Sequence, residues 1–222
     1  MITLKQLTAS YFSISEDELE KRTKECNSIM VEDWKNKKDI LSFYKNNKEY
    51  IFDLVLFNNE TRINNLLHPI LYVKNTKILD YGAGIGILDI ILGEDNIVYY
   101  YDICEENVKF AKFLSNAIGN KPVFLETEED VMSKTYDGII LTDVLEHLEN
   151  PMEVVKRLSG QLRIGGWLLT TGLDFSTGEH IPMHLVENKQ YRDELQEFFY
   201  QEFRIIFYHA TANETIYVYI KK

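Results

Sequence analysis

Cysteine and proline are scarce in this chain of 222 residues, which has two cysteines and four prolines. Cys26 and Cys104 form no Cys-x-x-Cys pair and no Cys/His cluster with the spacing of a zinc site. This usage indicates ordinary thiols in a reducing compartment and excludes a disulfide framework. The sequence also contains no internal repeat and no low-complexity linker. An ordinary globular fold is therefore expected.

Basic residues and long apolar runs are scarce as well. The 24 Lys and Arg residues are outnumbered by 35 Asp and Glu residues, which gives a formal net charge of −11. Because a protein that grips phosphates needs a basic face, nucleic acid is disfavoured as a partner. No run approaches the roughly 18 apolar residues of a spanning helix. Residues 1–5 lack the charged start and apolar core of a signal peptide. We expect a cytoplasmic protein without a membrane partner.

The residues that are abundant suffice for a folded core. Hydrophobic residues make up 45% of the chain and aromatic residues 13%. Residues 1–72 contain no glycine and have helical periodicity, as at Ile63, Leu66, Leu67 and Ile70. Pro69 should end or kink the last of these helices. We predict an N-terminal helical cap or lid over residues 1–72 and a second domain over residues 73–222.

From residue 77 onward, strand and helix patterns alternate. Strands are predicted at 77–81, 97–102, 121–126, 137–142 and 166–171, and helices at 105–118 and 151–162. The first helix should bury Val108, Ala111 and Ile118 and stop at Gly119. Gly165-Gly166 should turn the chain into the fifth strand. Such alternation predicts a parallel sheet covered on both faces. Runs at 203–208 and 215–220 predict a closing antiparallel hairpin.

The most informative stretch is Ile78-Leu79-Asp80-Tyr81-Gly82-Ala83-Gly84-Ile85-Gly86. An apolar strand ends there in an acid and three glycines at alternate positions, and a helical run follows. A turn without side chains lets the backbone approach a ligand closely, and the helix that follows directs its free N–H groups at the ligand. A tight turn without a ligand is the alternative.

Asp102 ends the second strand, twenty residues after Gly82. A carboxylate at this place can accept hydrogen bonds from both hydroxyls of a ribose, so a nucleoside-containing cofactor is predicted. The dinucleotide fingerprint is Gly-x-Gly-x-x-Gly, but position 87 is Ile and the third glycine is Gly86. This spacing disfavours a nicotinamide-dependent oxidoreductase.

The motif Asp80-x-Gly82-x-Gly84-x-Gly86 resembles the first motif of class I S-adenosylmethionine-dependent methyltransferases, and Asp102 is similar to their ribose-binding acid. The run 136–151 resembles the fourth-strand segment of the branch that acts on small molecules. The resemblance implies an α/β fold with a Rossmann-like parallel sheet that ends in an antiparallel C-terminal hairpin. It also implies S-adenosyl-L-methionine as the cofactor and S-adenosyl-L-homocysteine as the product.

The resemblance assigns cofactor contacts residue by residue. The three glycines would approach the methionine end of the cofactor, and Ile103 would pack on the adenine. Thr142 and Asp143 would lie near the methionine ammonium and the transferring methyl. The whole predicted set comprises Asp80, Gly82, Gly84, Gly86, Asp102, Ile103, Glu128, Thr142 and Asp143, with Glu129 as a second match for the acid near the adenine amino group.

Methyl transfer requires a base only where the acceptor carries a proton that must leave. The candidate catalytic residues are His147, His180 and His184, with structural or surface roles as the alternative. His147 lies in a Leu-Glu-His-Leu context that is common in the family. His180 and His184 follow the fifth strand, where relatives carry substrate-facing loops, and Pro182 lies between them.

A metal ion is left open by the sequence. Asp143-x-x-Glu146-His147 resembles the Glu-x-x-Glu-His metal site of some methyltransferases that act on quinone precursors or RNA 3′ ends, with Asp in place of the first Glu. His180 or His184 would complete the shell around a divalent ion. Similar Leu-Glu-His segments occur without a metal.

We therefore expect an enzyme that transfers a methyl group from S-adenosylmethionine to an O, N or C nucleophile of a small molecule. One alternative is a non-catalytic or regulatory domain that binds the same cofactor. Others are a metal-dependent O-methyltransferase and a nicotinamide-dependent oxidoreductase. The sequence identifies neither the methyl acceptor nor the oligomeric state.

Overall fold

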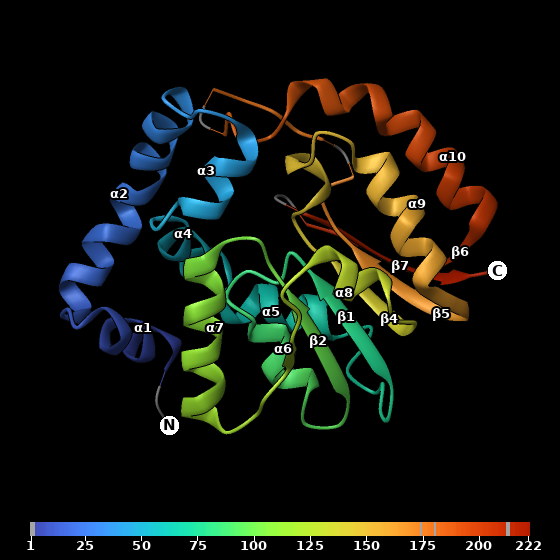
Figure 1. Cartoon of the computed structure of the whole chain (residues 1–222), viewed down its shortest axis with the longest axis horizontal. Helices are drawn as coiled ribbons and strands as arrows, with labels where there is room; N and C mark the ends of the chain where they lie inside the picture. Colours follow the sequence, from blue (N-terminus) through green and yellow to red (C-terminus); the bar gives the residue numbers. More distant parts are fainter. Residues whose placement is uncertain (1–2, 174, 180, 212–213) are drawn as a thin grey trace.

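A mixed β-sheet runs through the middle of the molecule, as the computed structural model shows (Figure 1). The structure describes residues 3–173, 175–179, 181–211 and 214–222. Over these residues the strand order is β3-β2-β1-β4-β5-β7-β6, in which β1 to β5 pair in parallel and β7 pairs antiparallel with β5 and β6. The strands are β1 (Lys77–Tyr81), β2 (Ile97–Tyr101), β3 (Val123–Phe124), β4 (Tyr136–Leu141), β5 (Leu162–Thr170), β6 (Phe203–Ala210) and β7 (Thr215–Lys221).

Helices cover both faces of this sheet because neighbouring residues of each strand point to opposite sides. The helices and 3-10 helices after β1 are α6 (Ile87–Leu92), α7 (Glu105–Ile118), α8 (Glu128–Met132), η1 (Leu145–His147), α9 (Pro151–Gln161), η2 (Val186–Tyr191) and α10 (Arg192–Glu202). Leu79 packs in the core with α8, α9 and α10, whereas Ile78 packs on the opposite side with α6 and with α5 (Glu60–Leu67). The predicted doubly covered sheet with its antiparallel hairpin is confirmed.

The glycine-free N-terminal region forms helices before the first strand. These are α1 (Leu4–Phe12), α2 (Glu16–Lys35), α3 (Ile40–Asn46), α4 (Tyr50–Phe57) and the helix α5 that packs under the sheet. Ser15, Asp39 and Asn59 begin α2, α3 and α5, and each side chain accepts a hydrogen bond from a backbone N–H of the first turn. Helices α1, α3 and α4 contact α7. Figure 1 shows α1, α2 and α3, in blue, at one side of the sheet. The hydroxyl of Tyr44 in α3 donates to the carbonyl oxygen of Met183, in the segment between β5 and α10, at 3.3 Å.

No described helix has the length and apolar character that crossing a membrane would require. The 20-residue helix α2 is the longest of the helices named above, and its sequence is rich in charged residues. Its buried face is limited to Leu19, Cys26, Met30 and Trp34.

The predicted turn at Gly165-Gly166 is wrong, because both glycines lie inside β5. Tyr136 pairs with Leu162 and Gly138 pairs with Trp167, so β5 carries a bulge between these two pairs. Gly165 has a φ of +74° in the bulge. A Cβ atom on Gly166 would meet the Asp137 carbonyl oxygen at 2.9 Å, so a side chain has no room there. Gly165 and Gly166 therefore form the bulge within β5 and are not a turn before it.

The buried face of α7 also differs from the prediction. Ala111 is buried, but Ile118 is 51% exposed. Phe110 and Leu114 supply the larger buried side chains. The helix ends at Ile118 because Gly119 adopts the left-handed conformation, as predicted. Ile118, in the last turn, therefore extends beyond the core that α7 packs against.

Two carboxyl groups are buried together on the two sides of the glycine turn (residues 82–86). Asp80 in β1 is 2% exposed and Asp89 in α6 is 0% exposed. Burial raises the pKa of Asp80 to about 7, and burial and the charge of Asp80 raise the pKa of Asp89 well above its usual range. Two ionised carboxylates offer only acceptors to each other, so their burial side by side favours the protonated form of one. The raised pKa values mean that the folded pair holds a proton up to a higher pH than ordinary Asp groups do.

We expect the free energy of unfolding to fall as the pH rises from about 4 to 7, because the folded pair holds a proton that ordinary Asp groups of the unfolded chain have lost. Asp89→Asn replaces the protonated carboxyl with an amide that donates to Asp80 at any pH. The variant should be roughly 1–3 kcal/mol more stable than the wild type at pH 8, and its fall should be smaller, because only the raised pKa values of other groups such as Asp53 and Asp102 then contribute. Urea unfolding at two pH values measures both effects. Asp193→Asn, on the exposed start of α10, is the control. A wild-type stability that does not fall over this range would contradict the raised pKa values of this pair.

Candidate active site

The glycine turn is held by the neighbouring strand β2. The N–H groups of Gly82 and Ala83 donate to the carbonyl oxygen of Tyr101 at 2.8 and 3.0 Å. The hydroxyl of Tyr100 donates to the carbonyl oxygen of Gly84 at 2.7 Å. The glycines at 82, 84 and 86 have φ values of +74°, +55° and +70°, which glycine adopts without strain. The turn is thus a fixed loop at the carboxyl end of the sheet, as the sequence predicts.

Asp102 lies directly beside this turn, after the end of β2. One carboxylate oxygen accepts a hydrogen bond from the N–H of Gly84 at 2.8 Å. The other accepts from the N–H of Cys104 at 2.7 Å and from the side-chain amide of Asn107 at 3.4 Å. Burial raises the pKa of Asp102 to about 6, and these three donors oppose the rise. The predicted ribose-binding acid therefore also ties β2 to the glycine turn.

Helix α4 packs on the outside of the turn. A Cβ atom on Gly84 would lie 3.1 Å from Cδ1 of Leu54, so the two residues are in close contact. Ile51 of the same helix shares a core cluster with Ile85. Two cavities, of about 200 and 390 Å³, lie among the N-terminal helices, the first lined by residues between 33 and 47 and the second by residues between 3 and 60. The N-terminal helices therefore cover the glycine turn.

Helix α4 also brings two polar side chains to the carboxyl end of the sheet. Burial raises the pKa of Tyr50 well above its usual range, and Tyr44, Asp53, Asp143 and Asp102 raise it further. Burial and the charge of Asp143 raise the pKa of Asp53 to about 6. Asp143 thus acts on Asp53, and Asp53, Asp143 and Asp102 all act on Tyr50. The region is acidic.

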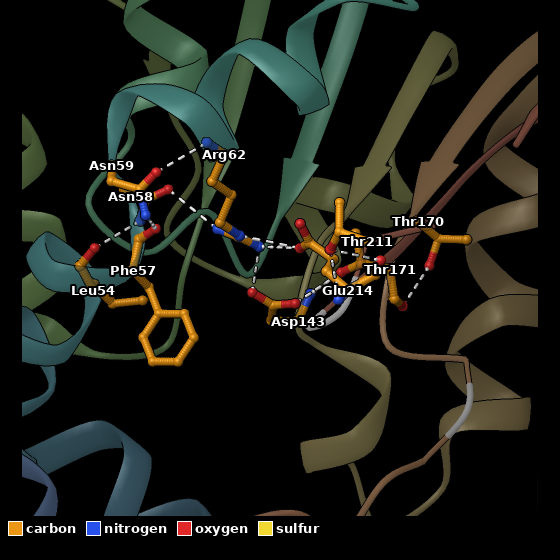
Figure 2. Close-up of polar contacts among 10 residues, drawn as sticks. All are labelled: Leu54, Phe57, Asn58, Asn59, Arg62, Asp143, Thr170, Thr171, Thr211 and Glu214. Atoms are coloured by element: carbon orange, nitrogen blue, oxygen red, sulfur yellow. Dashed lines mark hydrogen bonds and ion pairs between the residues drawn. The ribbon is translucent and has the colours of Figure 1, made fainter. Parts of the chain in front are cut away.

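One cation reaches this acidic region from α5, and Figure 2 shows how it lies. The guanidinium of Arg62 forms an ion pair with Asp143 and a second one with Glu214 at 2.7 Å. Its Nε donates to Glu214 at 3.0 Å, and a further N–H donates to the side-chain oxygen of Asn58 at 3.3 Å. Arg62 therefore joins the N-terminal helices to the end of β4 and to the residues before β7.

Asp143 itself has a constrained conformation. Its φ of +53° is uncommon for a residue with a side chain. Its N–H donates to the hydroxyl of Thr171, and that hydroxyl donates to the Asp143 carboxylate, both at 2.8 Å. The ends of β4 and β5 are thereby joined. Thr142, just before it, is partly buried.

The residues predicted for the adenine lie near the ends of β1 and β2. Glu128 accepts hydrogen bonds from the hydroxyl of Tyr81 at 3.3 Å and from Arg157 at 3.1 Å. Glu128 and Asp102 both raise the pKa of Tyr101, which places this ring near the two acids. Ile103 is partly buried against two core clusters. The predicted cofactor residues are thus spread along the carboxyl ends of β1, β2 and β4.

Two of the three predicted histidines meet. The rings of His147 and His184 lie 4.8 Å apart at an angle of 82°. Nδ1 of His147 is 2.7 Å from the hydroxyl of Tyr44 and 3.1 Å from the carbonyl oxygen of Met183. Burial, and then His184, lower the pKa of His147 to about 4, so it is neutral near pH 7. His180 lies outside the described residues.

The metal-binding set suggested by the sequence is only partly assembled. Glu146, His147 and His184 each offer a ligand atom, and these atoms lie within 4.8 Å of one another. Asp143 is not in this group, because Arg62 and Thr171 hold its carboxylate. Asp143 follows the end of β4, as the sequence predicts, but the contacts of its side chain depend on Arg62.

Comparison with known proteins identifies the family. A model of the family described as "Methyltransferase domain" matches residues 43–211, which is most of the chain. The chain belongs to this methyltransferase family. The match begins in α3 and includes the glycine turn, Arg62, His147 and His184. The family predicted from the motifs is confirmed.

Curated relatives of this methyltransferase share part of its sequence. The chain is 27% identical over 121 residues to the ubiquinone biosynthesis O-methyltransferase of Vibrio campbellii, over 52% of each chain. It is 27% identical over 105 residues to the protein of the same name from Rickettsia felis, over 46% of this chain and 43% of that protein. The chain spans about half the length of the curated relatives it matches.

Solved structures resemble this methyltransferase in fold. Magnesium protoporphyrin IX methyltransferase from Synechocystis, solved with S-adenosylhomocysteine bound, has a TM-score of 0.58 at 18% identity and covers 73% of this chain and 82% of its own. TehB from Haemophilus influenzae has a TM-score of 0.57 at 16% identity and covers 75% and 64%. At these identities the likeness concerns the fold alone.

Several residues of the methyltransferase site were not predicted from the sequence. Arg62, Tyr50 and Asp53 lie on helices that the sequence analysis treated only as a cap. One signal could have indicated Arg62, because it is the only Lys or Arg between Lys48 and Lys74. Nothing local distinguishes Asp53 from an exposed acid of an amphipathic helix.

Substitution of Gly84 tests the contact between α4 and the glycine turn. Gly84→Ala should lower stability by about 1–2 kcal/mol for the positive φ, and by roughly 1 kcal/mol more for the contact with Leu54. Gly165→Ala is the matched control, because Gly165 has a φ of +74° and a Cβ atom added there would meet no other atom within 4 Å. Urea unfolding compares the two.

In a Leu54→Ala background, the Gly84→Ala substitution should lower the free energy of unfolding only by the cost of the positive φ, because the contact with the Leu54 side chain is absent. The double variant is therefore compared with Leu54→Ala alone. Equal losses for Gly84→Ala and Gly165→Ala would contradict the packing of α4 on the turn.

Proposed function

We propose that this chain is an S-adenosylmethionine-dependent methyltransferase that methylates an O, N or C nucleophile of a small molecule. The observation that carries the proposal is the junction of the glycine turn with Asp102, in which the acid after β2 holds the N–H of Gly84 at 2.8 Å. A glycine turn and an acid at adjacent strand ends form a site for a nucleoside ligand. Membership of the methyltransferase family supports the same cofactor.

The charges around the site fit this cofactor. S-adenosylmethionine carries a sulfonium, an ammonium and a carboxylate, and it has no phosphate. Asp53, Asp102 and Asp143 supply negative charge at the carboxyl end of the sheet, and Arg62 supplies a cation among them. A phosphate-bearing cofactor would meet unfavourable charge here. These three carboxylates and one guanidinium therefore suit a ligand that carries more positive than negative charge.

The residues of the chain divide the work of holding the cofactor. Asp102 would accept hydrogen bonds from the ribose, and Ile103 and Glu128 would contact the adenine. The glycine turn would hold the methionine end, with Asp80 buried behind it, and Thr142 and Asp143 would lie near the ammonium. We assign the methionine carboxylate to Arg62, which would exchange its ion pair with Asp143 or Glu214 for it, because a guanidinium matches a carboxylate in shape and charge.

The cofactor supplies an electrophilic methyl group when it is bound. The protein contributes alignment of the acceptor, which can be worth about 7–11 kcal/mol in well-oriented reactions. An acceptor with a proton on its nucleophile must lose that proton, and His147 and His184 are the described histidines placed to receive it. Burial keeps His147 neutral near pH 7 and also makes it a weaker base than an ordinary histidine.

The N-terminal region, residues 1–72, would act as a cap over this site. Three contacts support this role: Leu54 with Gly84, Tyr44 with His147, and Arg62 with Asp143. Each joins a helix before β1 to the carboxyl end of the sheet. A cap excludes water from the reacting groups and strengthens the electrostatic interactions among them.

A small molecule is the acceptor that the observations support best. The relatives are named as ubiquinone biosynthesis O-methyltransferases. The net charge of −11 disfavours a nucleic-acid acceptor.

Asp102→Asn tests the cofactor assignment. The amide keeps the shape but has one acceptor oxygen in place of two, so S-adenosylmethionine affinity should fall by about tenfold or more. Isothermal titration calorimetry measures this, with NADH as a ligand that should bind to neither protein. Asp193→Asn is the control and should bind like the wild type. Wild-type affinity in Asp102→Asn would contradict the ribose assignment.

Arg62→Lys tests the contact with the methionine carboxylate. Lysine keeps the charge between Asp143 and Glu214 but loses the planar fork, so affinity for S-adenosylmethionine should fall by roughly tenfold. Decarboxylated S-adenosylmethionine lacks the group in question and should bind the wild type and the variant alike. An equal loss for both ligands would show that Arg62 acts only through the structure of the site.

A further inference from the structure

Strand β6 lies at one edge of the sheet (Figure 1). It pairs with β7 on one side, and over the described residues it is the last strand in the order. An edge strand directs part of its backbone N–H and C=O groups away from the sheet, so it can pair with a strand of another chain. The opposite edge is formed by β3, which has only two residues. The edge of β6 is therefore the longer of the two.

Apolar side chains are exposed along this edge. Ile205, Ile206 and Tyr208 are 55%, 52% and 60% exposed. The eight residues of β6 include one arginine and no Asp or Glu, although the chain has a net charge of −11. The strand itself thus carries no negative charge that would repel a second copy of this acidic chain.

The backbone groups of β6 that face outward can be identified from the two ends of the β6–β7 hairpin. The N–H of Lys222 donates to the carbonyl oxygen of Glu202 at 2.9 Å, and the N–H of Thr211 donates to that of Glu214 at 2.8 Å. Residue pairs of an antiparallel ladder alternate between pairs that exchange hydrogen bonds and pairs that direct these groups outward. Counting from each end to the bulge between positions 205 and 207, the outward residues are Phe203, Ile205, Tyr208 and Ala210.

The side chains of β6 follow the same order. Residues that oppose each other across two strands point to the same face of the sheet. Ile205 and Tyr208 pair with Tyr219 and Tyr217, which pack on the side of α10. Phe207 instead packs on the side of α5. The outward residues at 205 and 208 therefore have their side chains on the same face, although they are three positions apart.

The bulge lies at the centre of the strand. It adds Ile206 beside Phe207, and both oppose Val218, which packs on the side of α5. From position 203 to position 210, the faces then read α10, α5, α10, α5, α5, α10, α5, α10. This order is the same from either end of the strand. A bulge at an edge usually prevents pairing, but a central bulge matches the same bulge in a strand that runs the opposite way.

We propose that two copies of this chain pair through β6, antiparallel and with Ile205 of each copy opposite Tyr208 of the other. This register also sets position 203 opposite 210 and position 206 opposite 207. Each outward residue then faces an outward residue, and each side chain opposes one on the same face. A shift of one or two residues in either direction breaks this match. A second copy fits because an unrelated strand would need the same central bulge, and the pair closes because it uses the β6 edge of both copies.

Sedimentation equilibrium of the full chain, at about 1–200 µM and about 0.15 M salt, measures the association. The mass of the wild type should rise from 26.1 kDa towards twice that value. The dissociation constant should be on the order of 10 µM, because one pair of strands makes a small interface. A mass that stays at 26.1 kDa up to the highest concentration overturns the proposal. The measurement is made without cofactor, so it is independent of the proposed function.

Two substitutions at the edge locate the contact. Ile205→Lys and Tyr208→Glu each place a charge opposite an apolar side chain, and the two-fold symmetry repeats this change in the pair. Each should raise the dissociation constant by about tenfold or more. The matched controls are Leu41→Lys and Leu41→Glu, at a 49% exposed position of α3, and both should associate as the wild type does. A dimer that both edge variants retain at wild-type affinity overturns the proposal, because the contact would then lie on another surface.

An equimolar mixture of the Ile205→Lys and Tyr208→Glu chains tests the register. In the mixed pair, the two introduced charges lie opposite each other once, and the wild-type side chains face each other once. The mixture should therefore associate at least about tenfold more tightly than either variant alone. A mixture of Ile205→Lys with Leu41→Glu should show no such gain, and circular dichroism establishes that each variant folds. Association of the first mixture that is no tighter than that of the single variants overturns the proposed pairing.

Discussion

The hydrogen bond from the N–H of Gly84 to Asp102 is the contact on which the site depends. It joins the turn after β1 to the end of β2, and Tyr100 and Tyr101 hold the same turn through its carbonyl and N–H groups. Three glycines leave the backbone free to adopt other conformations, so these contacts select one arrangement of the turn. Because Asp102 is held as well by Cys104 and Asn107, the acid and the turn take up one arrangement.

Negatively charged groups outnumber positively charged ones near this turn. Burial raises the pKa values of Asp80 and Asp89 behind it, while Asp53, Asp102 and Asp143 lie on the side of the N-terminal helices. Arg62 offsets part of this charge, but Glu214 and Asp143 both engage it. The excess of negative charge explains why the site suits a cationic ligand. Burial raises several carboxyl pKa values in this region, and neighbouring carboxylates add to some of these shifts because each negative charge makes the next ionisation more costly.

The N-terminal helices have a larger part than covering a finished domain. Leu66 and Leu67 of α5 pack in the core on one face of the sheet, and Ile51 of α4 packs with Ile85 beside the glycine turn. Arg62 and Tyr44 extend from these helices to Asp143 and His147. The carboxyl end of the sheet is therefore completed by residues that precede the first strand. The family match, which begins at residue 43, includes most of these helices.

Local patterns in the sequence determined the order of the strands and helices, the glycine turn with Asp102, and the family. These features follow from neighbouring residues, because hydrophobic periodicity and a glycine-rich motif are readable without distant contacts. The misread segment, Gly165-Gly166, differs because glycine suits a turn and a β-bulge equally, and only pairing with β4 selected the bulge. Tertiary structure alone decided that Arg62 reaches Asp143 and Glu214, and that His184 meets Glu146 and His147. Arg62 and Glu214 are 152 positions apart in the chain, and no local rule of propensity or spacing specifies which distant side chains packing will bring together.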